Sequence, residues 1–158
     1  MSHLAPMVVS GRGSSWTFGL LGTLGFGLVT VAICLFVNAQ PDSLNYMFAH
    51  TNTLGAVVCS VWLVGVLVIS YLAGLASGHL GGGVIAGLVM GGLSGPTYTV
   101  ITNILFPYWY GTPIAWGPWS VFFSIVVVGV ILGIFGIGIG ALVGLLGGTI
   151  GAIISKHQ

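Results

Sequence analysis

The chain has 158 residues, of which 56% are hydrophobic and only 2% are charged. Soluble domains carry about 25% charged residues, so Arg12, Asp42 and Lys156 cannot by themselves keep a folded surface of this size in water. The net charge of +1 gives no electrostatic basis for binding nucleic acid. The composition therefore excludes a soluble globular protein and a nucleic-acid partner. It predicts that residues 1–158 form one transmembrane domain surrounded by membrane lipid.

Four apolar segments are long enough to cross a bilayer as helices, since about 20 apolar residues span the hydrocarbon core. The first exceeds the ~7–15 apolar residues of a signal peptide, so we expect it to be retained. The last is expected to continue toward Ile154 as one long helix. The predicted fold class is therefore all-α, an integral membrane bundle of four transmembrane helices. The expected helices lie at about residues 16–37, 53–74, 83–106 and 119–146 or longer.

The few charges predict the orientation in the membrane. Arg12 precedes the first apolar segment and Lys156 follows the last. An even number of crossings puts both termini on one side, and the positive-inside rule makes that side cytoplasmic. We therefore expect a multi-pass protein of the cell membrane with both termini in the cytoplasm.

The 28 glycines include two series in which glycine recurs at every fourth residue. This spacing places each series on one helix face, where the missing side chains let another backbone approach closely. Either the two faces pack against each other within one chain, or one of them faces another subunit. Their overlap in membrane depth favours mutual packing. The predicted packing residues are Gly83, Gly87, Gly91 and Gly95 in the third segment, and Gly136, Gly140, Gly144 and Gly148 in the fourth.

A string of polar residues surrounds Pro96 in the third segment. Ser94, Tyr98 and Thr102 share one helix face, and Asn103 lies on the next. Proline removes one hydrogen bond from the helix, so these groups are expected to satisfy freed backbone atoms or to bond between helices. The alternative is a polar path for an uncharged solute or a lipid headgroup.

Catalytic and metal-binding patterns are missing from the sequence. The chain has no glutamate, and Asp42 falls in a loop, so it cannot form a carboxylate pair for acid–base catalysis. Cys34 and Cys59 lie in apolar segments and are expected to be buried thiols. We therefore expect no catalytic residues, no metal site and no cofactor of the chain's own. The four histidines fall outside the apolar segments and are not expected to converge within the membrane; they are His3, His50, His79 and His157.

Residues 71–95, YLAGLASGHLGGGVIAGLVMGGLSG, predict a helical hairpin with a turn rich in glycine and alanine. This stretch resembles small four-helix membrane proteins of unknown function from archaea and some bacteria, which share this turn and a glycine-rich last helix. The resemblance covers about two-thirds of the chain and implies the four-helix fold, but no chemistry. Those proteins carry more charge in the turn, where this chain has only His79.

These patterns favour a non-catalytic accessory or structural subunit of a larger membrane complex, packed through its glycine faces against other membrane subunits. The alternative is a small homo-oligomeric channel or carrier for an uncharged solute, with a path along Ser94, Tyr98, Thr102 and Asn103. A third hypothesis is a subunit whose aromatic and glycine faces contact a lipid, quinone or pigment supplied by a neighbour.

Overall fold

The computed structural model describes residues 11–39, 53–105 and 122–157. Within these residues the protein is all-helical, and four of its helices are long and apolar enough to cross a membrane. The prediction of an all-α protein with four such segments is confirmed. The helices are α1 (Gly11–Asn38), α3 (Thr53–Ser77), α4 (Leu80–Val100) and α6 (Gly129–Ser155).

Two of the helices carry a π-helical turn at the same end of the bundle. Ile101–Leu105 continues α4, and Ser124–Val128 leads into α6. The helix that contains α6 reaches Ser155 without a break. Both α1 and α3 extend beyond the predicted segments, because polar and small residues at the ends of an apolar segment can remain helical outside the hydrocarbon.

The turn between α3 and α4 explains why α4 begins at Leu80 rather than near residue 83. Gly78 adopts a positive φ of 69°, a left-handed conformation that ends α3, and its N–H donates to the carbonyl of Gly74 at 2.9 Å. His79 caps α4, because its Nδ1 accepts a hydrogen bond from the Gly82 N–H at 3.1 Å. These two caps make a tight turn between α3 and α4.

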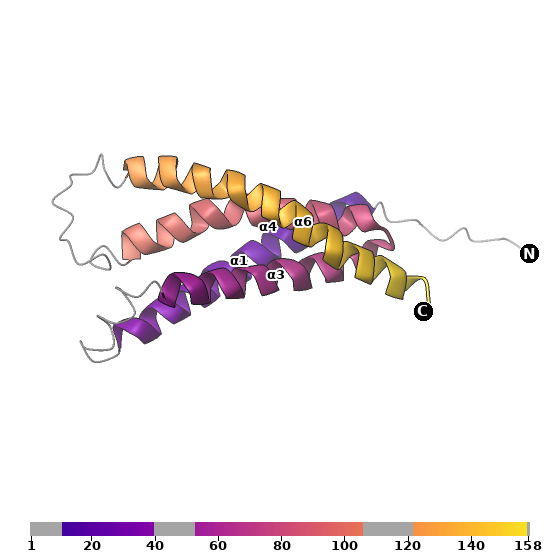
Figure 1. The fold of residues 1–158 in the computed structure, drawn as a ribbon, viewed down its shortest axis with the longest axis horizontal. Helices are drawn as coiled ribbons and strands as arrows, with labels where there is room; N and C mark the ends of the chain where they lie inside the picture. Colours follow the sequence, from indigo (N-terminus) through magenta and orange to yellow (C-terminus); the bar gives the residue numbers. More distant parts are fainter. Residues whose placement is uncertain (1–10, 40–52, 106–121, 158) are drawn as a thin grey trace, which may run out of the picture.

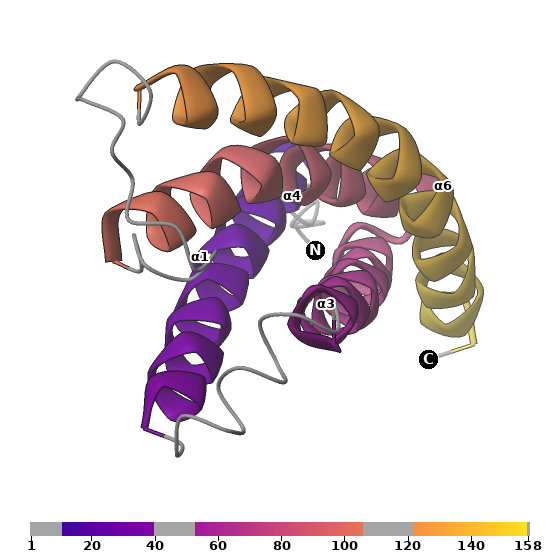
Figure 2. The same ribbon diagram turned by 60° about the vertical axis from the view of Figure 1, so that its left-hand side comes forward.

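The helices form two hairpins, α1 with α3 and α4 with α6 (Figure 1). Helix α6 packs along α4 and, with its later half, along α3, while α1 packs on α3 and α4 (Figure 2). The two hairpins lie close together near the Gly78 turn. They diverge toward the opposite end, where α1 and α4 end and α6 begins (Figure 1).

Many of the fully buried side chains are small, and many large apolar side chains are exposed. Thr30, Cys34, Ser15 and Ser70 are fully buried beside Met90 and Val66, whereas Leu142 and Phe135 of α6 are 68% and 67% exposed. Close helix packing needs small residues inside, and a lipid-facing surface accepts large apolar ones. This distribution is typical of helices packed within a membrane.

Candidate functional site

The structure brings the two glycine series together along the contact between α4 and α6. A Cβ added at Gly144 would lie 2.9 Å from the carbonyl oxygen of Gly83, and one added at Gly87 would lie 3.0 Å from the Cα of Gly144. The first distance is too short for a real Cβ and the second is tighter than most Cβ contacts, so the two backbones lie directly against each other. The eight predicted glycines all lie in this contact. Gly83, Gly87 and Gly91 face Gly136, Gly140, Gly144 and Gly148, whereas Gly95 faces Gly129 and Gly133. These faces are covered within the chain, which does not fit the alternative that one of them faces another subunit.

Helix α6 carries a second glycine face, which sequence reasoning missed. A Cβ at Gly147 would lie 2.7 Å from the carbonyl oxygen of Leu67 in α3, and one at Gly151 would lie 2.7 Å from the amide nitrogen of Leu75. The two glycines are four residues apart, so their spacing carried the signal. Because the later half of α6 touches both α3 and α4, it joins the two hairpins.

The polar string in α4 forms hydrogen bonds within its own helix. The Ser94 hydroxyl donates to the carbonyl of Met90, the Thr102 hydroxyl to that of Tyr98 at 2.9 Å, and the Asn103 amide to that of Thr99 at 2.9 Å. Hydroxyl-to-carbonyl bonds of this kind satisfy a polar side chain without water. The hydroxyl hydrogens of Ser94 and Thr102 and one amide hydrogen of Asn103 are therefore already used within the helix and are not free to bind a solute.

Pro96 lies where α4 meets the first turns of α6. Proline leaves the carbonyl of Gly92 without its usual amide donor. A Cβ at Gly133 would lie 2.9 Å from that oxygen, so α6 covers the carbonyl with glycine backbone. The Thr99 hydroxyl donates to the carbonyls of Gly95 at 3.2 Å and Pro96 at 2.9 Å. These bonds go to carbonyls beside the proline and not to that of Gly92, which is covered by packing against α6.

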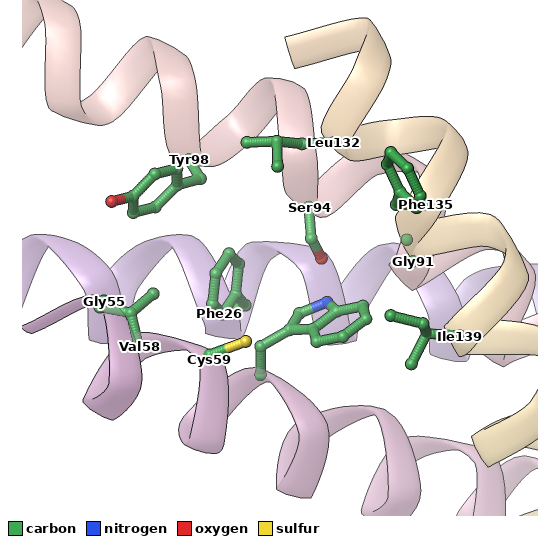
Figure 3. A pocket seen from close by; sticks show the side chains of 12 residues that line it. Phe26, Gly55, Val58, Cys59, Gly91, Ser94, Tyr98, Leu132, Phe135 and Ile139 are labelled. Atoms are coloured by element: carbon green, nitrogen blue, oxygen red, sulfur yellow. The ribbon is translucent and has the colours of Figure 1, made fainter. Parts of the chain in front are cut away.

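A cleft of about 280 Å³ lies between the four helices in the part of the bundle where the hairpins diverge. We call it the four-helix cleft. Two of the predicted path residues, Ser94 and Tyr98, line it, whereas Thr102 and Asn103 do not. Its side chains come from every helix (Figure 3). They are Phe26 of α1; Gly55, Val58, Cys59 and Trp62 of α3; Gly91, Ser94 and Tyr98 of α4; and Leu132, Phe135, Gly136 and Ile139 of α6.

The walls of the four-helix cleft are apolar and aromatic, and none of the described residues that line it is charged. The Ser94 hydroxyl donates its hydrogen to the carbonyl of Met90. The indole nitrogen of Trp62 is buried and has no hydrogen-bond partner in the described part of the chain. Ligand sites typically combine apolar walls with a few polar groups, and this cleft is near the smaller end of their usual volumes. It can hold an uncharged, mainly apolar molecule.

A wider groove of about 540 Å³ lies between α1 and α3. Its sides are mainly valines and glycines, with Leu21 and Ile69, and Met90 of α4 contributes to its lining. Phe26 lines both this groove and the four-helix cleft. Aliphatic walls of this kind match lipid acyl chains.

The histidine and cysteine side chains in the described residues do not converge on a common site. Within the described residues, no three His, Cys, Asp or Glu side chains gather as a metal site would need. His79 caps α4, and His157 is exposed after α6, while His3, His50 and Asp42 lie outside the described residues. Cys34 is buried as expected.

The expectation of a buried thiol is wrong for Cys59, which is exposed. Cys59 lines the four-helix cleft, at the end where the hairpins separate. An apolar neighbourhood in the sequence did not distinguish an open cleft from a packed interface.

No protein-family model matches the chain, and no curated protein or solved structure matches it either, so the resemblance to small archaeal and bacterial membrane proteins stays a prediction.

Proposed function

We propose that this protein binds an uncharged, predominantly apolar molecule within the membrane, in the four-helix cleft. The observation that carries the proposal is that all four helices contribute side chains to one apolar cleft where the two hairpins diverge. If the protein is a carrier for an uncharged solute, as the sequence suggested as an alternative, we propose that this solute is also apolar.

The chemistry of the cleft supports this choice of ligand class. A charged molecule would lose its hydration without gaining an ionic partner, because none of the described lining residues is charged. A sugar or another polyhydroxylated solute needs many hydrogen-bonding groups, but the cleft offers few: the hydroxyls of Ser94 and Tyr98 and the indole N–H of Trp62. Aromatic and aliphatic walls, by contrast, provide contact surface for rings and hydrocarbon chains.

The proposal is tested by photolabelling with an uncharged, long-chain diazirine probe in lipid nanodiscs, followed by mapping of the labelled peptides. Labels are expected on cleft residues such as Val58 and Leu132. Gly55→Leu should reduce them several-fold, because Gly55 lines the cleft and a Cβ there meets only open space.

Gly138→Leu is the matched control. A Cβ at Gly138 also meets only open space, but this glycine is exposed on α6 and does not line the cleft. The control should leave the labelling pattern unchanged. The proposal would be refuted if the labels were spread evenly over outward residues such as Leu142 and if Gly55→Leu did not change them.

A non-catalytic accessory subunit of a membrane complex is the second candidate function. It is favoured by the outer face of α6, where Ile134, Leu142 and Leu146 are each more than 60% exposed. This candidate now rests on large apolar side chains, since the glycine faces are covered by other helices of the chain. Co-purification of different membrane subunits, measured by native mass spectrometry in mild detergent, would support it. A particle containing only this chain would count against it.

The proposed location is the cell membrane, with both termini in the cytoplasm. Helix α1 begins and α6 ends at the same end of the bundle (Figure 1), and the exposed Lys156 follows α6 there. The positive-inside rule assigns that end to the cytoplasm. Impermeant labelling of a cysteine introduced at Lys156, in intact and in opened cells, tests the orientation: labelling in intact cells would reverse it.

A further inference from the structure

Most hydroxyl groups in the described helices donate to a carbonyl of their own helix. Thr23 donates to Gly19 at 2.9 Å, and Thr30 donates to Phe26 at 2.8 Å. Two buried polar side-chain atoms in the described residues have no hydrogen-bond partner. They are the indole nitrogen of Trp62 and the hydroxyl oxygen of Ser70. Buried polar groups without partners are rare in folded proteins, and each asks for a physical reason.

Close helix packing explains why the Ser70 hydroxyl has no hydrogen-bond partner. A Cβ at Gly147 would lie 3.1 Å from the Cβ of Ser70, and a Cβ at Gly83 would lie 2.8 Å from the Ser70 carbonyl oxygen. The side chain is fully buried where α3, α4 and α6 meet. A small residue is required at this position, and there is no space for a ligand beside the hydroxyl.

Trp62 differs from Ser70 because it borders open volume. Its side chain is 8% exposed and lines the four-helix cleft. The indole nitrogen is a hydrogen-bond donor only. The Ser94 oxygen lines the same cleft and keeps lone pairs for accepting, but no hydrogen bond joins it to the indole. The lining of the cleft therefore includes a tryptophan whose buried N–H has no acceptor among the described residues.

The depth of Trp62 in the bundle makes this donor costly. The apolar span of α3 begins at Gly55, and Trp62 lies about 10 Å further along the helix axis, inside the hydrocarbon region. Tryptophan in membrane proteins is enriched at the interfaces, where its N–H reaches water or headgroups. Water is scarce at the depth of Trp62, so another acceptor must be supplied.

We infer that the indole N–H of Trp62 donates a hydrogen bond to a carbonyl oxygen of the molecule held in the four-helix cleft. The ligand class is then an apolar molecule with an embedded carbonyl, such as a lipid ester or a quinone or ketone ring. A carbonyl satisfies the donor without bringing charge into the apolar cleft. This inference rests on the proposed binding function and names its recognition group.

The test compares two diazirine probes of equal length, one with a ketone and one with a methylene in its place. In the wild-type protein in nanodiscs, the ketone probe should label the cleft about 3–10-fold more efficiently, as expected for one hydrogen bond. Trp62→Phe keeps an aromatic ring but removes the N–H. It should abolish the preference, so that the two probes label the variant with equal efficiency.

The outcomes separate the inference from the proposed function. A ketone preference that persists in Trp62→Phe overturns the role of the indole, although the cleft still binds. Failure of both probes to label the wild-type cleft overturns the binding function itself. Loss of the preference in Trp62→Phe, with the methylene probe still bound, supports both.

A direct readout covers the case in which Trp62→Phe does not fold. In protein labelled with ¹⁵N-tryptophan, the indole proton signal of Trp62 should shift downfield when the ketone probe is added, and not with the methylene probe. An unchanged signal would contradict the inference.

Two further probe pairs identify the source of the carbonyl. A diester phospholipid compared with its diether analogue tests a lipid ester, and a long-chain benzoquinone compared with the matching alkylbenzene tests a ring carbonyl. A preference for the carbonyl member of either pair that requires Trp62 supports the inference and names the source. Equal binding within both pairs contradicts it.

Discussion

Gly91 of α4 and Gly136 of α6 lie backbone against backbone, so that a Cβ on either would collide with the carbonyl oxygen of the other. The same reciprocal relationship holds between Gly87 and Gly140, one turn further along. In lipid, apolar side chains gain little by leaving one apolar surroundings for another, so close backbone contact is a main source of helix association. These pairs therefore hold α4 and α6 together.

Gly140→Leu is expected to destabilise the protein strongly, by about 3 kcal/mol, since the clash is with backbone and α4 must move away. Gly138→Leu is the matched control, because the same change on the same helix meets open space and should have little effect. Thermal unfolding of both variants in mild detergent measures the difference. Equal melting temperatures for the two variants would show that the glycine contact does not stabilise the bundle.

The four helices could be predicted because segment length and hydropathy reflect the thickness of a membrane. The pairing of α4 with α6 could also be predicted, because the two glycine series have the same spacing and overlap in depth. The four-helix cleft could not be predicted. Its residues, among them Phe26, Trp62 and Phe135, are ordinary apolar residues, and their convergence depends on where the hairpins diverge.

The polar string near Pro96 was visible in the sequence, but its role was not. A threonine hydroxyl that repairs its own helix and one that lines a path have the same sequence pattern. The structure separates them, because Thr102 bonds to the carbonyl of Tyr98 and does not line the cleft, whereas Ser94 does.

Ser70→Ala should leave the stability unchanged or raise it by up to about 1 kcal/mol, because it removes a buried hydroxyl that has no partner and keeps the small volume. Ser70→Leu should be severely destabilising, since α6 passes directly over this position. Chemical or thermal unfolding of the two variants provides the test. A clear loss of stability in Ser70→Ala would mean that the hydroxyl forms a bond in the folded protein.

His79→Ala is expected to destabilise the α3–α4 hairpin by about 1 kcal/mol, the usual effect of losing a side-chain cap. His79→Asn should restore most of this stability, because an asparagine oxygen also accepts from the first-turn amides. Comparing the unfolding midpoints of the two variants separates capping from a role of the imidazole itself. If His79→Asn is as unstable as His79→Ala, the cap is not what His79 contributes.

Phe26→Ala should join the four-helix cleft to the groove between α1 and α3, because the ring of Phe26 lines both. The side chain is 6% exposed, so its loss should destabilise the protein by about 3 kcal/mol, as for other aromatic residues truncated in a packed core. The enlarged space should accept bulkier diazirine probes than the wild-type cleft accepts.

Phe135→Ala is the informative comparison, since Phe135 also lines the cleft but is 67% exposed. Lipid can replace much of its contact, and its truncation should cost well under the loss seen for Phe26→Ala. Labelling with probes of increasing width, together with unfolding of both variants, checks the pair. If the two truncations widen probe acceptance equally, Phe26 does not separate the two spaces. If they do not, the ring of Phe26 sets the size limit of the four-helix cleft on its α1 side.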